Sequence, residues 1–225
     1  MEIGPGRGAL TAHLLERADR VVAVEIDPIL VQYLRAKFRG ADRLELVEGD
    51  ILRVDLARWG PAVVVGNLPY YITSPIVEKV LGLGAALTRA VFLVQKEVAE
   101  RLTAAPGSRD YGYLTVATQF FAQVEYLFTV PPAAFQPAPK VDSAVVRLTP
   151  RRELPGADPA EFLRFASLCF QHKRKTLRNN LSEAYGRDAL APLPEAGLRA
   201  EQMSLEALLE LYEKLHAPIT TRKTH

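Results

Sequence analysis

Four consecutive residues, Asn67-Leu68-Pro69-Tyr70, combine side-chain types that could hold a planar base with an exocyclic amine. The amide oxygen of Asn67 and the backbone carbonyls of the Leu68-Pro69 turn can accept hydrogen bonds from an amine. The ring of Tyr70 offers a face for a base that has left its stack. Because the amine of adenine is a weak nucleophile, these acceptors would favour methyl transfer to it by positioning it in line. The alternative is structural, with Asn67 capping a turn and Tyr70 packing.

A second stretch, Glu2-Ile3-Gly4-Pro5-Gly6-Arg7-Gly8, is typical of a loop that approaches a ligand closely. Its three alternate glycines allow a tight turn and leave no Cβ in the way of a bound group. A helix expected at about 9–17 would direct its free N–H groups at this turn. A nucleotide-like cofactor is the expected occupant, but spaced glycines occur in NAD enzymes, flavin enzymes and methyltransferases, and sometimes form only a turn.

Carboxylates follow two of the expected strands. Glu25 lies at the end of the β-branched run that begins at Val21, and Asp50 follows a strand over about 43–47. An acid at the end of the second strand of a nucleotide-binding sheet lies where ribose hydroxyls bind, which makes Glu25 the candidate. Asp27 precedes a proline and fits a helix N-cap better. For Glu25 the alternative is a solvated loop position.

The elements that would position these side chains alternate between strand and helix. Strands are expected at about 21–27, 43–47, 62–67 and 90–95, with helices between them. This alternation predicts a parallel, doubly wound α/β sheet, in which ligands bind beyond the carboxyl ends of the strands. Glu25, Asp50 and Asn67 fall at such ends and would converge with the glycines on one crevice. Ser74-Pro75 predicts the start of the helix after Asn67.

The second half of the chain departs from this alternation. A helix over 114–121 is followed by two expected strands, 124–130 and 141–148, which would close the sheet as a hairpin. Polar, turn-rich residues at 149–158 predict a boundary, after which helices are expected at 159–170, 173–185 and 204–216. We therefore expect a first domain at 1–150, a helical domain at 151–217 and a tail at 218–225.

Composition limits the classes of protein to which the chain can belong. Its 225 residues are 48% hydrophobic and 24% charged, which suits a soluble protein with one large domain or a large and a small one. No apolar run approaches the ~18 residues of a membrane span, so we expect a cytoplasmic protein. The single cysteine excludes an internal disulfide, and the four histidines show no ligand spacing, so no metal is expected.

A local basic cluster stands out because the net charge is only +2, too small to indicate nucleic-acid binding by itself. Lys173, Arg174, Lys175 and Arg178 follow one another with no acid between them. Such a cluster suits phosphate contacts, which position a nucleic acid without reading its sequence. The alternative is a solvated helix face.

Four motifs in order along the chain resemble those of the ribosomal RNA adenine dimethyltransferases: Glu2–Gly8, Asn67–Pro75, Phe92–Arg101 and Phe135–Ser143. The ordered set is far more specific than any one motif, and the resemblance runs over nearly the whole chain. Within the family, the bacterial small-subunit (16S) enzymes are the most similar. The last of the four motifs favours them over the large-subunit methyltransferases that confer macrolide resistance.

This resemblance implies a Rossmann-like, S-adenosylmethionine-dependent methyltransferase sheet with a small all-α C-terminal domain. The implied reaction is transfer of methyl groups to N6 of two adjacent adenosines in the 3′-terminal hairpin loop of small-subunit rRNA, during ribosome biogenesis. The implied partner is this rRNA or the immature 30S particle. We expect a monomer that needs no metal and forms no covalent intermediate with its substrate.

The resemblance also implies roles for the residues that match its motifs. Tyr70 and Phe135 would hold the target base between their rings, and Asn67 would contact both cofactor and target. The implied catalytic set is Asn67, Leu68, Pro69, Tyr70 and Phe135. The implied cofactor-binding set is Glu2, Gly4, Gly6, Glu25, Ile26, Asp50, Ile51 and Asn67. The implied RNA-binding set is Lys173, Arg174, Lys175 and Arg178.

One departure from the family lies at the start of the chain. The family has a segment ahead of the glycine motif that includes a Gln-Asn-Phe-Leu element and most of the first strand. We therefore expect that the chain lacks its natural beginning and that it binds the cofactor poorly.

Two other functions stay open from the sequence. An NAD-dependent dehydrogenase would share the glycine loop and the strand-end acid, but it gives no reason for Asn67–Tyr70. A catalytically impaired relative acting as a ribosome-assembly or nucleic-acid-binding factor would bind the particle without transferring methyl groups.

Overall fold

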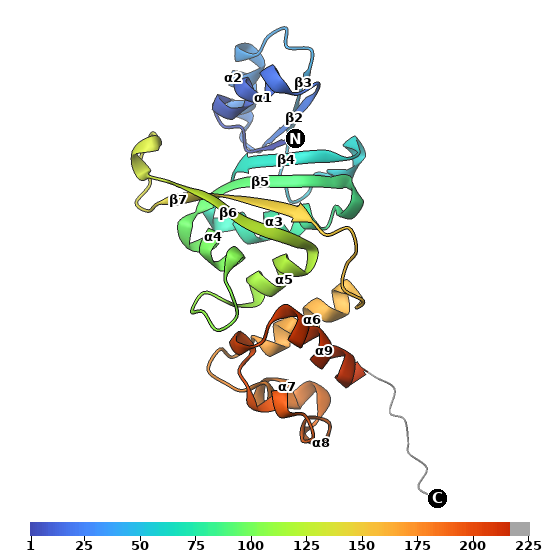
Figure 1. Ribbon diagram of the computed structural model, residues 1–225. Coiled ribbons are helices and arrows are strands. Elements are labelled where there is room, and N and C mark those ends of the chain that lie inside the picture. Colours follow the sequence, from blue (N-terminus) through green and yellow to red (C-terminus); the bar gives the residue numbers. More distant parts are fainter. Residues whose placement is uncertain (217–225) are drawn as a thin grey trace, which may run out of the picture. The chain divides into compact units, whose positions relative to one another are not determined.

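The computed structural model describes residues 1–216, so the tail expected at 218–225 lies outside the described residues. The chain divides into two compact units (Figure 1). Unit 1 comprises Met1–Thr103 and Phe121–Arg152, and unit 2 comprises Ala104–Phe120 and the chain from Glu153 onward. The segment Ala104–Phe120, which the sequence pattern places in the first domain, thus groups with the helical unit.

Unit 1 is built on a seven-stranded sheet in the order β3-β2-β1-β4-β5-β7-β6. Strands β1 to β5 pair in parallel, whereas β7 is antiparallel to both β5 and β6. The strands are Glu2–Ile3 (β1), Val21–Glu25 (β2), Leu44–Glu48 (β3), Ala62–Asn67 (β4), Leu87–Gln95 (β5), Ala122–Val130 (β6) and Ser143–Pro150 (β7). The predicted α/β sheet with a closing hairpin is confirmed. Its order reverses direction at β1 and β4, the point at which such sheets open a ligand crevice.

Four α-helices of unit 1 cover this sheet (Figure 1). They are Ala9–Arg17 (α1), Pro28–Lys37 (α2), Thr73–Leu81 (α3) and Lys96–Thr103 (α4). Helix α1 packs against β2, α2 against β2 and β3, α3 against β5, and α4 against β5, β6 and β7. Fully buried β-branched and aromatic side chains such as Val64, Phe92 and Val146 fill the space between sheet and helices. This burial of apolar area fixes the strand ends that carry the site.

Local signals predicted one helix start and missed another. Asp27 caps α2 by accepting a hydrogen bond from Ile29 N at 2.8 Å, with proline next in the chain, as predicted. The expectation that Ser74 caps the following helix is wrong, because α3 already begins at Thr73 without a side-chain cap. A 3-10 turn at Tyr70–Ile72 (η2) continues directly into α3. An N-cap residue has an extended backbone, whereas Ser74 already lies inside the helix, so it cannot act as the cap.

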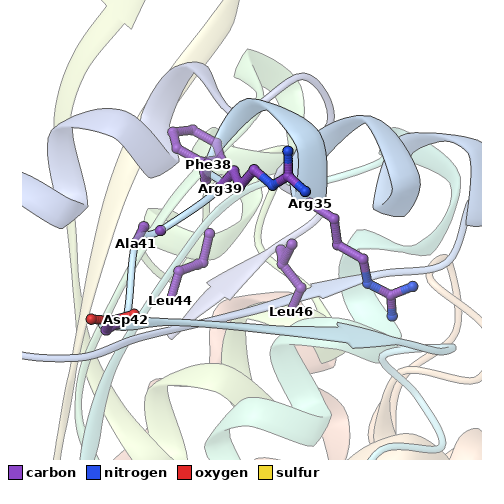
Figure 2. Close-up of a pocket in the computed structure, with 8 residues that line it drawn as sticks. Arg35, Phe38, Arg39, Ala41, Asp42, Leu44 and Leu46 are labelled. Carbon is purple, nitrogen blue, oxygen red and sulfur yellow. The ribbon is translucent and has the colours of Figure 1, made fainter.

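The outer strand β3 presents different chemistry on its two faces, as strand alternation requires. On one face Leu44 and Leu46 lie beneath Phe38, Arg35 and Arg39 and line a hollow of about 440 Å³ (Figure 2). The hollow is bounded by the loop that leads into β3 and by the first half of that strand. It therefore lies away from the carboxyl end of the sheet, where a cofactor is expected.

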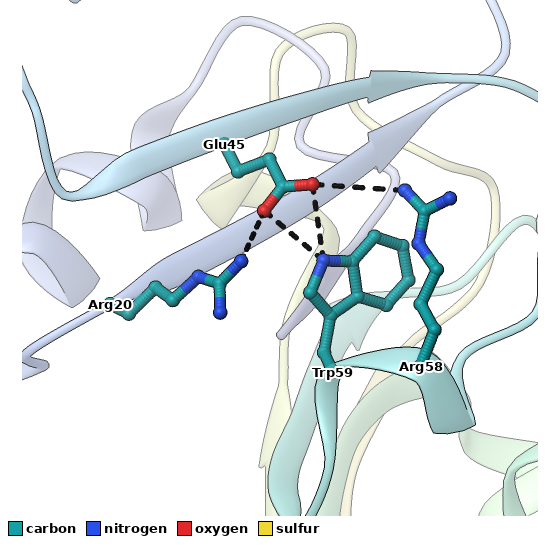
Figure 3. Close-up of polar contacts among 4 residues, drawn as sticks. All are labelled: Arg20, Glu45, Arg58 and Trp59. Atoms are coloured by element: carbon teal, nitrogen blue, oxygen red, sulfur yellow. Dashed lines mark hydrogen bonds and ion pairs between the residues drawn. The ribbon is translucent and has the colours of Figure 1, made fainter.

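On the other face Glu45 ties β3 to two flanking segments (Figure 3). Its carboxylate accepts a hydrogen bond from Arg20 Nη2 at 2.6 Å and from Trp59 Nε1 at 3.1 Å, and it lies 3.7 Å from Arg58. The Arg58 guanidinium stacks 3.9 Å from the centre of the Trp59 ring. The hydrogen bond from Arg20 is the main cause that lowers the pKa of Glu45.

Unit 2 contains five α-helices among its described residues. They are Tyr113–Phe121 (α5, whose last residue belongs to unit 1), Pro159–Cys169 (α6), Leu177–Tyr185 (α7), Arg187–Leu190 (α8) and Leu205–His216 (α9). Their core is aromatic: Phe162 stacks on Phe120 at 4.8 Å and meets Tyr212 edge-on at 5.8 Å. The buried Phe120 on α5 explains why the segment before it groups with the helical unit. Cys169 is buried in the same core, and burial raises the pKa of its thiol.

The expected helix at 173–185 begins later than predicted. Residues 171–175 form a turn, and α7 begins only at Leu177. The side-chain amide of Asn180 donates to the carbonyls of Cys169 at 2.7 Å and His172 at 3.3 Å. These tertiary hydrogen bonds keep residues 171–175 in a turn and out of the helix. Among residues 1–216, none of the helices combines the length and apolar character needed to cross a membrane.

We expect Glu45→Gln to lower stability at pH 7 by at most about 1 kcal/mol, because the side chain is partly exposed and its ion pairs are screened. Because the folded pKa is depressed, the carboxylate stabilises the fold above the ordinary value of 4.5 and loses this effect as the pH falls through the folded value. Urea unfolding at pH 7 and pH 3 measures the difference, which should shrink on acidification.

Glu78→Gln is the control, because Glu78 is exposed on α3 and makes no ion pair within the described part of the chain. A constant gap between Glu45→Gln and the unaltered protein at both pH values would contradict this account.

Candidate cofactor and target-base site

The glycine loop after β1 depends on three left-handed backbone positions. Gly4, Gly6 and Gly8 have φ values of 63°, 58° and 74°, which side chains rarely tolerate. Gly4 N donates to Val24 O at 2.9 Å, which fixes the loop to the end of β2. A Cβ at Gly6 would meet no atom within 4 Å, and one at Gly4 would lie 4.0 Å from the Asn67 carbonyl oxygen. The loop therefore leaves open space on one side and adjoins the end of β4 on another.

The end of α2 packs against this loop at Arg7 and Gly8. A Cβ added to Gly8 would lie only 2.5 Å from Phe38 Cε2 and 2.8 Å from Leu34 Cδ2. Lys37 Nζ donates to the Arg7 carbonyl at 2.7 Å. Sequence reasoning missed Phe38 and Lys37, because nothing in a linear motif shows that a residue thirty positions away packs on the third glycine. The glycine type at this position is thus required by packing as well as by φ.

Glu25 is the side chain that joins the loops after β1 and β2. It is only 6% exposed. Oε2 accepts from Gly6 N at 3.0 Å, and Oε1 accepts from Ile26 N at 2.9 Å and Asp27 N at 3.1 Å. A carboxylate has about four acceptor positions, so three N–H donors leave capacity for a ligand hydroxyl. The site accordingly suits the ribose of a nucleotide cofactor at the end of the second strand.

Glu2 lies deeper and makes a structural contact. Its Oε2 accepts from Thr11 Oγ1 at 2.6 Å, and both residues are buried. Burial is the main cause that raises the pKa of Glu2, and the nearby negative charge of Glu25 raises it further. The contact links β1 to the first turn of α1 and so supports the glycine loop from below.

The end of β3 adds Asp50 to the same edge. Gly49 N donates to the Glu25 carbonyl at 2.9 Å, so the two strand ends are adjacent. Asp50 Oδ1 accepts from Leu52 N at 2.9 Å, and Oδ2 lies 3.7 Å from Arg53 Nε. Ile51 is buried, whereas Ile26 is 66% exposed. An exposed isoleucine beside Glu25 offers an apolar surface on which an adenine ring could rest.

The end of β4 carries the residues expected to hold the amine. Asn67 is exposed, and Leu68 N donates to Leu93 O of β5 at 3.0 Å. The Pro69 carbonyl already accepts from Ile72 N at 3.2 Å and from Thr73 Oγ1 at 3.1 Å. Within residues 1–216, no hydrogen bond is made to the Leu68 carbonyl or to the Asn67 side chain. These two groups are therefore the ones that remain available to an incoming amine.

A pocket of about 340 Å³ brings the two expected aromatic residues together. Its lining consists of Asn67, Leu68, Pro69, Tyr70, Phe135, Gln136, Pro137 and Pro139. Phe135 comes from the segment between β6 and β7, far from Tyr70 in sequence. Both rings are only partly buried, as a surface that receives a base requires. Gln136, Pro137 and Pro139 were not predicted to line the pocket, because a proline-rich sequence does not reveal where its loop folds back.

The basic cluster, formed by Lys173, Arg174, Lys175 and Arg178, belongs to unit 2. Lys173 Nζ donates to the Arg109 carbonyl at 2.7 Å, so this lysine holds the turn at 171–175 to the loop before α5. Arg174, Lys175 and Arg178 are exposed and make no ion pair within the described residues. Cations that are free of acidic neighbours suit phosphate contacts.

The loops that follow β1, β2 and β3 together form what we call the cofactor edge. This edge adjoins the pocket at Asn67, which lines the pocket and whose carbonyl faces Gly4. One edge of the sheet therefore provides a place for a nucleoside and, beside it, a place for a planar base with an amine. Residues 1–216 contain no group of three His, Cys, Asp or Glu side chains arranged to hold a metal ion. The fold and this paired site define the class of protein as a Rossmann-like methyltransferase.

Comparison with known proteins supplies the family. The ribosomal RNA adenine dimethylase family matches residues 1–215. A ribosomal RNA small subunit methyltransferase A from Acidobacterium capsulatum is 48% identical over 227 residues, covering 96% of this chain and 80% of the relative. The protein of the same name from Thermosynechococcus vestitus is 47% identical over 226 residues, covering 96% of this chain and 85% of the relative.

Solved structures agree with the sequence relatives. A dimethyladenosine transferase from Plasmodium falciparum has a TM-score of 0.81 at 28% identity, covering 95% of this chain and 89% of that one. The 23S rRNA methyltransferase ErmE has a TM-score of 0.69 at 35% identity, covering 93% of this chain and 88% of that one. The chain belongs to the ribosomal RNA adenine dimethylase family. S-adenosylmethionine is the methyl donor of this class.

The bracing of the glycine loop yields a prediction. Gly8→Ala forces a Cβ onto the Phe38 ring in addition to the left-handed strain of roughly 1–2 kcal/mol that any alanine would meet at such a φ. We expect it to lower both the free energy of unfolding and the affinity for S-adenosylmethionine. Urea unfolding and titration calorimetry measure the two quantities.

Gly40→Ala is the matched control. Gly40 also has a positive φ, of 84°, but a Cβ there would meet nothing within 4 Å. The Gly40→Ala variant should lose only the part of the free energy of unfolding that the backbone strain costs, and its affinity for the cofactor should not change. Equal losses in the two variants would show that Phe38 does not brace the loop.

Proposed function

We propose that the protein transfers methyl groups from S-adenosylmethionine to N6 of adenosines in small-subunit ribosomal RNA. The observation that carries the proposal is the pocket formed by Asn67–Tyr70 and Phe135 beside the cofactor edge. It has the acceptors and the ring faces that an adenine amine requires. The choice of subunit is supported by the 43–48% identity to relatives named for the small subunit. The identity to the 23S rRNA methyltransferase is 35%.

The sequence motifs support a finer proposal for the substrate. The proposed targets are two adjacent adenosines in the 3′-terminal hairpin loop, each methylated twice, within an immature small subunit. The rings of Tyr70 and Phe135 would take the place of the neighbouring bases, so a target base has to leave its stack to enter the pocket. We further propose that the protein acts as a monomer in the cytoplasm, without a metal.

The chain's own residues would divide the work as follows. The cofactor supplies the methyl group, and Glu25 holds its ribose through the capacity left by three backbone donors. In the first transfer the Asn67 amide oxygen and the Leu68 carbonyl accept from the two N–H bonds of the amine, and in the second transfer one of them accepts from the single N–H that remains. These bonds keep electron density on the nitrogen and aim it in line. The faces of Tyr70 and Phe135 hold the ring. Among the described residues, no carboxylate or histidine lines the pocket, so the displaced proton passes to water.

Methyl transfer to small ribosomal subunits that lack dimethyladenosine tests the proposal, with nucleosides identified by mass spectrometry. We expect dimethyladenosine on these subunits and none on large subunits or on mature small subunits. Asn67→Ala should lower the rate by about 100-fold or more, the order of magnitude for loss of a group that stabilises a transition state. Particle binding without any methyl transfer would instead identify a non-catalytic assembly factor.

The basic cluster makes a separate prediction about RNA affinity. Replacing Arg174 and Lys175 with glutamine should weaken binding to small subunits. It should also reduce the slope of log affinity against log salt by about 0.7–0.9 for each phosphate that is no longer neutralised. S-adenosylmethionine affinity should not change, because the cofactor edge is in unit 1. Filter binding at several salt concentrations measures the slope.

Arg187→Gln is the control for general loss of positive charge, since Arg187 is an exposed cation of the same unit without an ion pair in the described chain. If Arg187→Gln changed the slope as much as each substitution in the cluster, the cluster would have no special part in binding.

A further inference from the structure

The hydroxyl of Tyr70 makes a contact that the proposed chemistry does not use. Its oxygen lies 3.1 Å from Ser143 Oγ, a hydrogen-bond distance between two residues 73 positions apart. Tyr70 is partly exposed at the pocket, whereas Ser143 is fully buried. The far end of the ring is thus attached to the interior of the sheet while one face of the ring stays at the pocket.

Ser143 occupies a well-determined place in the sheet. It is the first residue of β7 and pairs with Gln95 at the end of β5 on one side and with Val130 at the end of β6 on the other. A side chain fixed between two neighbouring strands has little freedom to move. The same strand follows directly from the loop that carries Phe135. Ser143 therefore contacts Tyr70 on one side of the pocket and begins the strand that follows the Phe135 loop on the other.

Stacking alone does not explain why the residue at position 70 needs a hydroxyl. A phenylalanine would present the same ring face to a base. A ring held only at its Cβ can still change its tilt through rotation about two side-chain bonds. The hydroxyl oxygen lies on the Cβ–Cγ axis, so a hydrogen bond to it restrains rotation about the Cα–Cβ bond, which would swing the whole ring. It fixes the position of the ring relative to Asn67, three residues earlier in the chain.

We infer that Ser143 is a positioning residue for methyl transfer, which sets the position of the Tyr70 ring through this hydrogen bond. The inference rests on the proposed function, in which the target base lies on that ring. Ser143 does not touch the base. It acts through the tyrosine, so that the amine of a stacked base is aimed at the Asn67 and Leu68 acceptors.

A double-mutant cycle tests the inference, with Ser143→Ala, Tyr70→Phe and the combination of both. Each single variant loses the same hydrogen bond and keeps the ring, so each should lower kcat by about three- to tenfold, the effect of one neutral hydrogen bond. KM for the small subunit should stay constant, because the surfaces that bind the particle are unaltered. The combined variant should be no slower than the slower single variant, because both substitutions remove one and the same bond.

Tyr126→Phe is the matched control. Tyr126 and Thr129 form a second tyrosine hydroxyl pair in the same unit, at 2.6 Å, on the exposed part of β6. Its loss should leave kcat unchanged. Thermal unfolding of all variants is measured in parallel, since a purely structural role for Ser143 would lower the melting temperature and the amount of active protein without a change in kcat per folded molecule.

The outcomes separate this inference from the proposed function. The rates are measured on whichever ribosomal RNA the unaltered protein methylates, so transfer to large subunits would overturn the proposed substrate and still allow the cycle to be completed. Unchanged kcat in Ser143→Ala, or multiplication of the two single effects in the combined variant, would overturn the inference alone. Absence of methyl transfer to either subunit would overturn both.

Discussion

A single buried carboxylate determines the arrangement of the cofactor edge. Glu25 accepts hydrogen bonds from the backbone of Gly6, Ile26 and Asp27, and so holds together the loops that follow β1 and β2. Backbone N–H groups at the start of loops must find acceptors once they leave the sheet, and here one side chain satisfies three of them. The left-handed turn at Gly6 and the end of β3, whose Gly49 N donates to the Glu25 carbonyl, meet at this residue.

The second half of the site depends on the antiparallel part of the sheet. In a sheet made only of parallel strands, the Asn67–Tyr70 turn would face open solvent beyond β5. The β6–β7 hairpin supplies what is missing, because its connecting loop contributes Phe135 and its second strand contributes Ser143. In the proposed function, the nucleoside cofactor binds at the ends of the parallel strands, and the target base is held with the help of the hairpin as well. This division explains why the pocket draws on segments so distant in sequence.

Sequence reasoning predicted the parts that follow from local periodicity and from parallel-strand geometry. Alternating strands and helices gave the sheet, and strand ends gave Glu25, Asp50 and Asn67 as neighbours, because all parallel strands end at one edge. It failed where a neighbouring element or a tertiary contact decides. Ser74 is no cap because η2 runs straight into α3. The helix expected from Lys173 starts only at Leu177 because Asn180 bonds the preceding turn. Neither the partner of Tyr70 nor the residue packed on Gly8 has a signal in the linear sequence.

In the proposed function, four strand ends form one S-adenosylmethionine site. A titration of the isotopically labelled protein with S-adenosylmethionine, followed through backbone amide NMR shifts, tests this arrangement. We expect the largest shifts at Gly4, Gly6, Ile26, Asp50 and Asn67. The hollow at β3, around Arg35 and Arg39, should show none of comparable size. Shifts that centre on that hollow, or that leave the amides of the glycine loop unchanged, would show that the cofactor binds elsewhere.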